Sequence, residues 1–412
     1  MSDTPNDCYV PSGLLTVDQA RDRLLAGLAP VTAVESVGLA DADGRALAHD
    51  LVAPHDLPPF AQSAMDGYAL AHRDAGGGTP VRLPLSGRVA AGDAPGVLTP
   101  GTAVRIFTGA PLPAGADTVL MQEDAVLEDG VLVVGPGLAA GRNCRLAGED
   151  VAAGAVALPA GRRLTPAALG LAAALGRQTL AVRAPLTVAL VSTGNEVRPA
   201  GAALGPGAIH DANGPMLSAL LRRLGCRVVP AGIIGDDLGA LTTRLAGLKA
   251  DLILSSGGVS AGEEDHVKAA VTALGGIDFW RLALKPGKPL AFGRVGATPF
   301  LGLPGNPYAA FVAFLALGRP LVQRLGGETV SDTPAFTARA GFTLNRAPGK
   351  REYLRVTLAS EGGVTVAHLS GATGSAALSS LAGADAIAVV AEGNAGVRPG
   401  DPLTVLPLHG VF

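Results

Sequence analysis

Three short segments of small and polar residues follow apolar runs in the middle of the chain, and their residue types suit oxyanion binding. The apolar run 250–254 leads into residues 255–265, which include Gly257 and Gly258. A strand that ends in glycine and serine before a helix exposes several backbone N–H groups, and such a nest at a helix N-terminus binds phosphate. The sequence therefore predicts an anion-binding loop after this strand.

Two further segments have the same character, Leu-Lys-Pro-Gly-Lys-Pro at 284–289 and Leu-Pro-Gly-Asn-Pro at 303–307. In a parallel sheet all three loops open on one edge, where ligands of α/β folds bind. Pro-Gly between Lys285 and Lys288 prevents a helix, so both ammonium groups are expected near the strand end. Charge-assisted hydrogen bonds contribute about 1.5–3 kcal/mol each, enough to capture a dianion from water. The alternative is a pair of solvated surface lysines.

Several carboxylates and an amide stand where predicted strands end or helices begin. Glu196 closes the segment Ser-Thr-Gly-Asn-Glu and can hold a divalent cation or a hydroxyl. Asp265 either caps the next helix or shares Mg²⁺ with a bound phosphate. Asn213 is either a helix-start residue or a ligand. Asp236, next to Asp237, is interpreted as part of a helix cap.

The N-terminal half carries a second candidate group. In residues 56–69, Asp66-Gly67 forms a tight turn that presents a carboxylate beside Tyr68. Alone, this is a structural Asx turn. Together with residues 105–110, which contain Thr108, and 147–150, which end in Asp150, it indicates strand ends that converge on one cleft.

The C-terminal part offers weaker candidates, and no nucleophilic catalyst is apparent. Arg351, Tyr353 and Arg355 alternate along a predicted strand and share a face. Ser375 lies on a glycine-rich approach to a helix. Both groups are alternatively plain surface. The chain has no G-x-S-x-G, no catalytic Cys–His signature and no Walker A lysine, which leaves positioning and electrostatics as the means of catalysis.

Composition narrows the class of protein. Of 412 residues, 48% are apolar and 16% charged, which allows a sizeable core and two or more domains. A net charge of −3, the absence of basic runs and 4% aromatic residues argue against nucleic-acid binding. Three scattered cysteines are expected to be reduced thiols. No apolar run reaches about 18 residues, so we expect no membrane span and a cytoplasmic protein.

These residues must be positioned by four modules. Alternating strand and helix signals over 184–328 predict a doubly wound parallel α/β domain. Short strands with turns, including a hairpin signal at Asp129-Gly130, predict a β-rich module at 35–146, and a further β module fills 329–412. Residues 12–34 and 147–183 are assigned to a linker and dimerisation subdomain. A helix is predicted in each, the first from a capping box formed by Thr16 and Gln19. The fold class is thus α/β with β-rich modules on both sides.

The motifs together resemble the MoeA family of molybdopterin molybdenumtransferases, which is related to the gephyrin E domain. The motifs that match, in order over nearly the whole chain, are PPF with SAMDGYA (58–60, 63–69), TGA (108–110), GED (148–150), STGNE (192–196), SGGVS (256–260), KPGKP (285–289) and LPGNP (303–307).

The resemblance implies a homodimer with each active cleft between the α/β domain of one subunit and the β-rich module of the other. It implies conversion of adenylylated molybdopterin and molybdate into molybdenum cofactor and AMP with Mg²⁺. It implies as further partners the molybdopterin adenylyltransferase and the acceptor molybdoenzymes. The catalytic residues implied are Asp66, Asp150, Glu196, Asp265, Lys285 and Lys288, with Asp66, Glu196 and Asp265 as Mg²⁺ ligands. The substrate-binding residues implied are Thr108, Asn213, Ser256, Gly257, Gly258, Ser260, Pro304, Asn306, Arg351 and Ser375.

Three positions depart from the family pattern. A polar pair such as Asp-Asn is usual where this chain has Ala61-Gln62, and Asn-Ser-Asn is common where it has Asp211-Ala212-Asn213. The serine common after Gly-Asn-Pro is Ala309 here. These departures concern individual ligand contacts, not the family.

Two other functions are consistent with parts of the sequence. A molybdopterin adenylyltransferase shares the α/β domain, but it has no need of a long β-rich module with Asp66 and Asp150. A gephyrin-like scaffold holds a peptide in a dimer groove, but this chain retains its polar cleft motifs.

Overall fold

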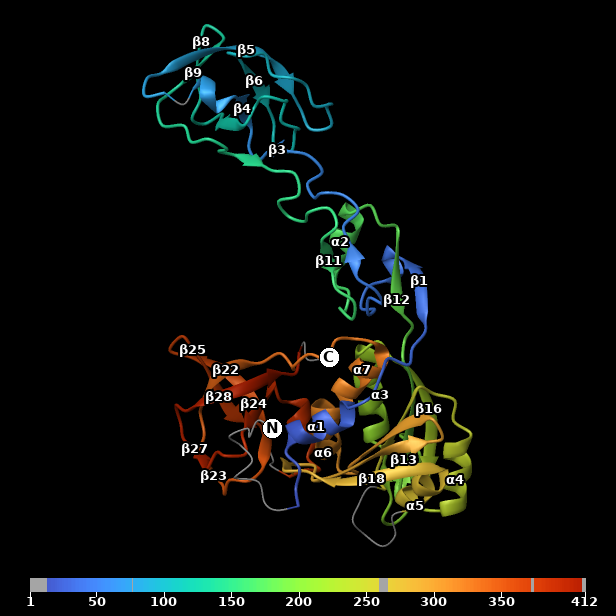
Figure 1. Ribbon diagram of the computed structural model, residues 1–412. Coiled ribbons are helices and arrows are strands. Elements are labelled where there is room, and N and C mark those ends of the chain that lie inside the picture. Colours follow the sequence, from blue (N-terminus) through green and yellow to red (C-terminus); the bar gives the residue numbers. More distant parts are fainter. Residues whose placement is uncertain (1–12, 76, 259–265, 372–373, 410–412) are drawn as a thin grey trace.

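The computed structural model describes residues 13–75, 77–258, 266–371 and 374–409. The chain forms an elongated body (Figure 1), with a β-rich module at one end and a slender linker module in the middle. The α/β domain and the C-terminal β module lie side by side at the other end. No helix in these described ranges has the length and apolar character needed to cross a membrane.

The α/β domain is built on a six-stranded sheet. Its strands, in spatial order, are β16 (Arg227–Ile234), β13 (Thr187–Thr193), β17 (Leu252–Ser256), β21 (Thr298–Leu303), β20 (Pro289–Val295) and β18 (Gly275–Arg281). The first four are parallel, as predicted, but β20 is antiparallel to both of its neighbours, so the sheet is mixed. Because β18 then runs in the same direction as β21, its carboxyl end reaches the same sheet edge.

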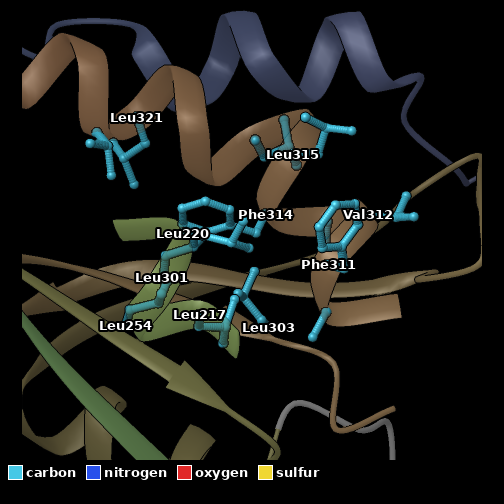
Figure 2. Close-up of a cluster of buried hydrophobic side chains, with 14 of the residues drawn as sticks. Leu217, Leu220, Leu254, Leu301, Leu303, Phe311, Val312, Phe314, Leu315 and Leu321 are labelled. Carbon is cyan, nitrogen blue, oxygen red and sulfur yellow. The ribbon is translucent and has the colours of Figure 1, made fainter. Parts of the chain in front are cut away.

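Helices cover both faces of this sheet. They are α3 (Asn213–Arg223), α4 (Leu238–Ala246), α5 (His266–Leu274), α6 (Pro307–Ala313) and α7 (Arg319–Gly326), with a π-helical turn, η4 (Phe314–Gly318), between the last two. Apolar side chains from α3, α6, η4 and α7 pack on one face around Phe314 (Figure 2), and α4 and α5 pack on the other. This burial on both faces explains the nearly continuous apolar runs of the central strands.

Helix α1 (Val17–Leu25) begins at the predicted capping box, with Thr16 and Gln19 bonding each other's backbone N–H groups. It buries Val17, Ala20 and Leu24 in the same core as Phe314. The helix thus packs with the α/β domain, whereas the sequence placed residues 12–34 in the linker subdomain.

The linker module takes its strands from both sides of the β-rich module. Strand β1 (Val34–Gly38) pairs with β12 (Thr179–Arg183), and β2 (Leu51–Val52) pairs with β11 (Val156–Leu158). Helix α2 (Pro166–Ala174) packs on them, and η2 (Leu39–Asp41) lies between β1 and β2. Residues 34–53 therefore belong here and not to the predicted module 35–146. Pairing between strands over a hundred residues apart leaves no local signal in the sequence.

The β-rich module contains a six-stranded sheet with the order β7, β4, β6, β5, β9, β8. Its elements are β3 (Gln62–Ser63), β4 (Gly67–Leu70), η3 (His72–Asp74), β5 (Val81–Val89), β6 (Ala103–Ile106), β7 (Thr118–Met121), β8 (Val126–Glu128), β9 (Val131–Val134) and β10 (Cys144–Arg145). The predicted hairpin at Asp129-Gly130 joins β8 to β9, and both residues have positive φ.

The C-terminal module is a closed barrel, because its strands pair in the ring β24, β25, β22, β28, β26 and back to β24. Its elements are β22 (Phe336–Ala340), β23 (Leu344–Asn345), β24 (Arg351–Glu361), β25 (Val364–Leu369), α8 (Leu378–Ala382), β26 (Ala386–Val390), β27 (Gly396–Val397) and β28 (Pro402–Pro407). Short strand β19 (Leu284–Lys285) leaves the α/β domain and pairs with β24, which joins the two modules. Strands β14 (Val197–Arg198) and β15 (Ile209–His210) form a small ribbon after β13.

Candidate functional site

A cleft of about 860 Å³ lies at the carboxyl edge of the α/β sheet. The loops after β13, β17 and β21 and the turn before β20 form it, and the Ser375 loop of the C-terminal module contributes one wall. The structure brings together there nine of the predicted residues: Glu196, Asn213, Ser256, Gly257, Gly258, Lys288, Pro304, Asn306 and Ser375. Ser260 and Asp265 lie outside the described residues.

The two glycines after β17 have backbone conformations that require glycine. Gly257 has a φ of 91° and Gly258 a φ of 65°. A Cβ on Gly257 would lie 2.7 Å from the carbonyl oxygen of Thr193, and one on Gly258 would lie 2.3 Å from Val267 Cγ2. The N–H of Gly257 donates to Leu303 O at 3.1 Å. Gly257 therefore serves close backbone packing, and its N–H is not available to a phosphate.

Asn213 cross-links the loops that form the floor of the cleft. It is the first residue of α3, after the N-cap Ala212, and its side-chain oxygen accepts no hydrogen bond from any described residue. Its Nδ2 donates to Ser256 Oγ and to Gly305 O, both at 2.7 Å, and the residue is 8% exposed. The ends of β17 and β21 are thereby held together at the start of α3.

Glu196 and Asp236 line the cleft from the loops after β13 and β16. The Glu196 carboxylate folds back over Gly194, where a Cβ would lie 2.5 Å from Oε2. Asp236 accepts from the N–H of Asn195 at 3.1 Å, so it links the two loops. The predicted cap of α4 is Asp237 alone, which accepts from Ala240 N–H at 2.6 Å.

These carboxylates fit the way in which Mg²⁺ is bound in phosphate sites. Among the described residues there is no group of three or more His, Cys, Asp or Glu placed to hold a metal. Mg²⁺ commonly keeps several waters and uses only one or two carboxylates together with substrate phosphates. Glu196, beside the glycine loop, matches that requirement.

The two lysines of the Lys-Pro-Gly-Lys turn are used differently. Lys288 lines the cleft together with Pro286 and Gly287. Lys285 instead forms an ion pair with Glu352 on β24, across the ladder that joins the modules. The expectation that both ammonium groups line the anion pocket is met by Lys288 only.

Arg351 does not lie with the cleft residues, contrary to the sequence expectation. It lines a separate cavity of about 320 Å³ beneath α1. Its Nη2 lies 2.7 Å from Asp18 Oδ2, and its Nε lies 3.1 Å from Glu392 Oε1. Burial opposes the charge, but the bond to Asp18 and the nearby Glu392 raise the pKa of Arg351. Two carboxylates hold the Arg351 guanidinium away from the cleft, and one of them, Asp18, is 333 positions away in the sequence.

The residue of β24 that supports the cleft is Arg355, which the sequence offers only as a weaker candidate and which is not among the substrate-binding residues that the resemblance implies. Its guanidinium stacks on Tyr308 at 4.1 Å and donates to Ala377 O at 2.8 Å and Gly374 O at 3.2 Å. The N–H of Tyr308 donates to Ser375 O at 3.1 Å. Arg355 thus holds the Ser375 loop on α6. The sequence signal for Arg355 was its alternation with Arg351 along the predicted strand.

Asp66 and Thr108 form a compact pair in the β-rich module. Asp66 Oδ1 accepts from both the N–H and the hydroxyl of Thr108, each at 2.8 Å. These hydrogen bonds hold the pKa of Asp66 below its ordinary value, and the charge of Arg105 adds to the effect. Asp150 lines another pocket of the same chain, beside Pro58 and Gln62. Figure 1 places the β-rich module at the far end of the molecule from the α/β domain, which holds the cleft, so Asp66 and Thr108 do not reach the cleft of their own chain.

The chain matches family models over most of its length. The model described as MoeA N-terminal region (domain I and II) matches residues 15–176, and that of the MoeA C-terminal region (domain IV) matches 337–408. Between them, residues 189–324 match a probable molybdopterin binding domain. The central sheet and its cleft are therefore an α/β domain of the molybdopterin-binding class.

Relatives agree over the full length. The chain is 36% identical over 402 residues to the molybdopterin molybdenumtransferase of Haemophilus influenzae, covering 96% of this chain and 99% of the relative. It is 38% identical over 405 residues to molybdopterin molybdenumtransferase 2 of Mycobacterium tuberculosis, covering 95% and 99%. A crystal structure of the molybdopterin biosynthesis moeA protein from Pyrococcus horikoshii superposes with a TM-score of 0.78 at 27% identity, covering 95% and 99%. The chain belongs to the MoeA family.

Proposed function

We propose that this protein is a molybdopterin molybdenumtransferase that inserts molybdenum from molybdate into adenylylated molybdopterin, producing molybdenum cofactor and AMP. The observation that supports this most directly is the joint lining of one cleft by Lys288, Glu196 and the Gly257-Gly258 loop. Such a cleft offers the Lys288 cation to oxyanions, and the family relatives carry this activity in their names.

The chain's own residues act by position and charge. Lys288 attracts the molybdate oxyanion to the turn before β20, and the loops after β17 and β21 receive the phosphates of the nucleotide-linked pterin. Preorganised cations and dipoles in a sheltered cleft stabilise developing negative charge more than water does, because they need no reorganisation. Asn213 holds the two phosphate loops at a constant separation.

Glu196 is the described residue that would hold Mg²⁺, with Asp265 proposed as a second ligand. When bound, the cation offsets the repulsion between phosphate and molybdate oxygens. The carboxylate of Glu196 already lies at the cleft wall, held over Gly194.

The functional unit is proposed to be a homodimer in the cytoplasm. Asp66 and Thr108 lie in the β-rich module, at the far end of the molecule from the α/β domain (Figure 1). Asp150 lies between β10 and β11, where the chain leaves that module. In a twofold dimer of elongated chains, each β-rich module can reach the cleft of the partner. Asp66 then adds a carboxylate whose low pKa keeps it ionised.

Substitution of the cleft lysine tests the proposal. Lys288→Met is expected to abolish AMP release from adenylylated molybdopterin and molybdate while the protein stays folded and its assembly is unchanged. The matched control is Lys249→Met, because Lys249 is exposed before β17, at the opposite edge of the sheet. Wild-type turnover by Lys288→Met in a reconstituted assay would refute the assignment.

One measurement distinguishes the proposed function from that of a molybdopterin adenylyltransferase. Incubation of the wild-type protein with ATP and molybdopterin, without molybdate, is expected to release no pyrophosphate. Stoichiometric pyrophosphate release would instead assign the preceding step to this chain.

A further inference from the structure

Lys285 is held at the rim of the cleft by a carboxylate from another module. Its Nζ pairs with Glu352, whose side chain is only 4% exposed, while the Lys285 side chain is 63% exposed. The next two residues, Pro286 and Gly287, line the cleft. The base of Lys285 is thus beside the cleft, and its long, mostly solvated side chain is turned toward Glu352.

Glu352 does not depend on Lys285 alone for charge compensation. The Nε of Arg346 lies 3.3 Å from Glu352 Oε2, and the Arg346 side chain is 6% exposed. Arg346 is fixed by its own bonds to the carbonyl oxygens of Ala391, at 2.9 Å, and Lys350. A buried carboxylate left without any cation is strongly destabilising. With Arg346 in place, Glu352 stays paired even when Lys285 turns away.

We propose that Glu352 is a positioning residue whose ion pair holds the Lys285 ammonium at the edge of the cleft. When a tetrahedral dianion enters the cleft, Lys285 leaves Glu352 and pairs with that dianion. This inference rests on the proposed function, since it assigns a role in molybdate capture. In this exchange the exposed Lys285 ammonium moves, whereas the buried Glu352 carboxylate and Arg346 guanidinium stay in place. Competition with Glu352 weakens the binding of any oxyanion, so only an anion that Lys288 also contacts displaces the carboxylate.

The inference predicts opposite effects from two substitutions in one ion-pair network. Glu352→Gln removes the competitor and is expected to lower the molybdate Kd by about 1.5- to 5-fold. This range corresponds to about 0.2–1 kcal/mol, the contribution of an ion pair made by a solvent-exposed side chain, and the Lys285 side chain is 63% exposed. Arg346→Gln removes the alternative partner of Glu352, so Lys285 is retained more strongly and the Kd is expected to rise. Damage to a purely structural network would instead weaken binding in both variants.

Calorimetric titration of the full-length protein with molybdate measures these effects without catalysis, and thermal unfolding confirms that each variant is folded. In a Lys285→Met background, Glu352→Gln is expected to change the Kd no further. An equal effect in both backgrounds, or weaker binding in Glu352→Gln, overturns the inference. Should Glu352→Gln not fold, the rise in Kd for Arg346→Gln, and its loss in the Lys285→Met background, decides the question.

The same experiment distinguishes failure of this inference from failure of the proposed function. If the wild-type protein releases AMP normally but Glu352→Gln leaves molybdate affinity unchanged, only this inference fails. If the wild-type protein neither binds molybdate nor releases AMP, the proposed function fails.

Discussion

Some side chains in the cleft both stabilise the fold and shape the binding site. Asn213 shows this most clearly, because one buried amide group donates to both Ser256 Oγ and Gly305 O. The backbone around it is equally constrained, since Gly257 packs against Thr193 where no Cβ fits. The loops after β17 and β21 are therefore held in place before any ligand arrives.

Removal of this amide should cost both stability and substrate affinity. Asn213→Ala leaves the buried Ser256 hydroxyl and the exposed Gly305 carbonyl without their donor, and the buried group in that condition costs about 1–3 kcal/mol. Chemical denaturation is expected to show that loss, with a higher KM for the adenylylated pterin. Asn345→Ala, at an exposed position of β23, should change stability by less than about 0.5 kcal/mol. Equal effects of the two substitutions would rule out the cross-link as a source of stability.

Contacts between elements of different modules fix the relative positions of the cleft walls. Strand β19 pairs with β24, and Arg355 on β24 fixes the Ser375 loop on α6. Helix α1 joins this assembly through Asp18, which meets Arg351 on β24. The C-terminal barrel is thus attached to the α/β domain by ionic and backbone contacts on two sides.

The attachment through α1 should weaken in acid. The hydrogen bond from Arg351 lowers the pKa of Asp18 below its ordinary value of 3.8, although partial burial opposes the shift. A carboxyl group with a lowered folded-state pKa contributes stability above its unfolded pKa and loses it as pH falls through the folded one. Thermal unfolding of wild type and Asp18→Asn is expected to differ at about pH 6 and to converge below about pH 3.8. A difference that stays constant across this range would contradict the assignment.

At the scale of the whole molecule, the elongated shape separates two groups of candidate residues. The cleft lies in the α/β domain at one end, and the Asp66–Thr108 pair lies in the β-rich module at the other (Figure 1). A dimer is the simplest arrangement that unites them, because a twofold axis exchanges the two ends.

Mixed dimers of two inactive variants test this arrangement. Asp66→Asn and Lys288→Met damage different modules, so a dimer with one chain of each kind has one cleft with both defects and one with neither. Co-refolding equal amounts is expected to restore up to about a quarter of wild-type AMP release, since half of the dimers are mixed. Each variant alone, refolded in the same way, is the control. Failure to regain activity, with mixed dimers demonstrated by tagged chains, would place both groups in one chain's site.

Local patterns in the sequence predicted much of the α/β domain and its cleft. The capping box at Thr16, the hairpin at Asp129-Gly130, the parallel strands β13, β17 and β21 and the glycine loop all depend on a few consecutive residues. Backbone sterics and hydrogen bonding act over that range, so residue order alone carries the information.

Tertiary structure alone decided which of the predicted charges reach the cleft. Lys285 pairs with Glu352 and Arg351 with Asp18 and Glu392, and residues 34–53 joined the linker module through pairing with β11 and β12. An ion pair or a strand pairing between distant residues depends on how whole modules pack, and no periodicity in the chain records it. The sequence determined the chemistry available at the cleft, and the packing of the modules determined which charges are engaged elsewhere.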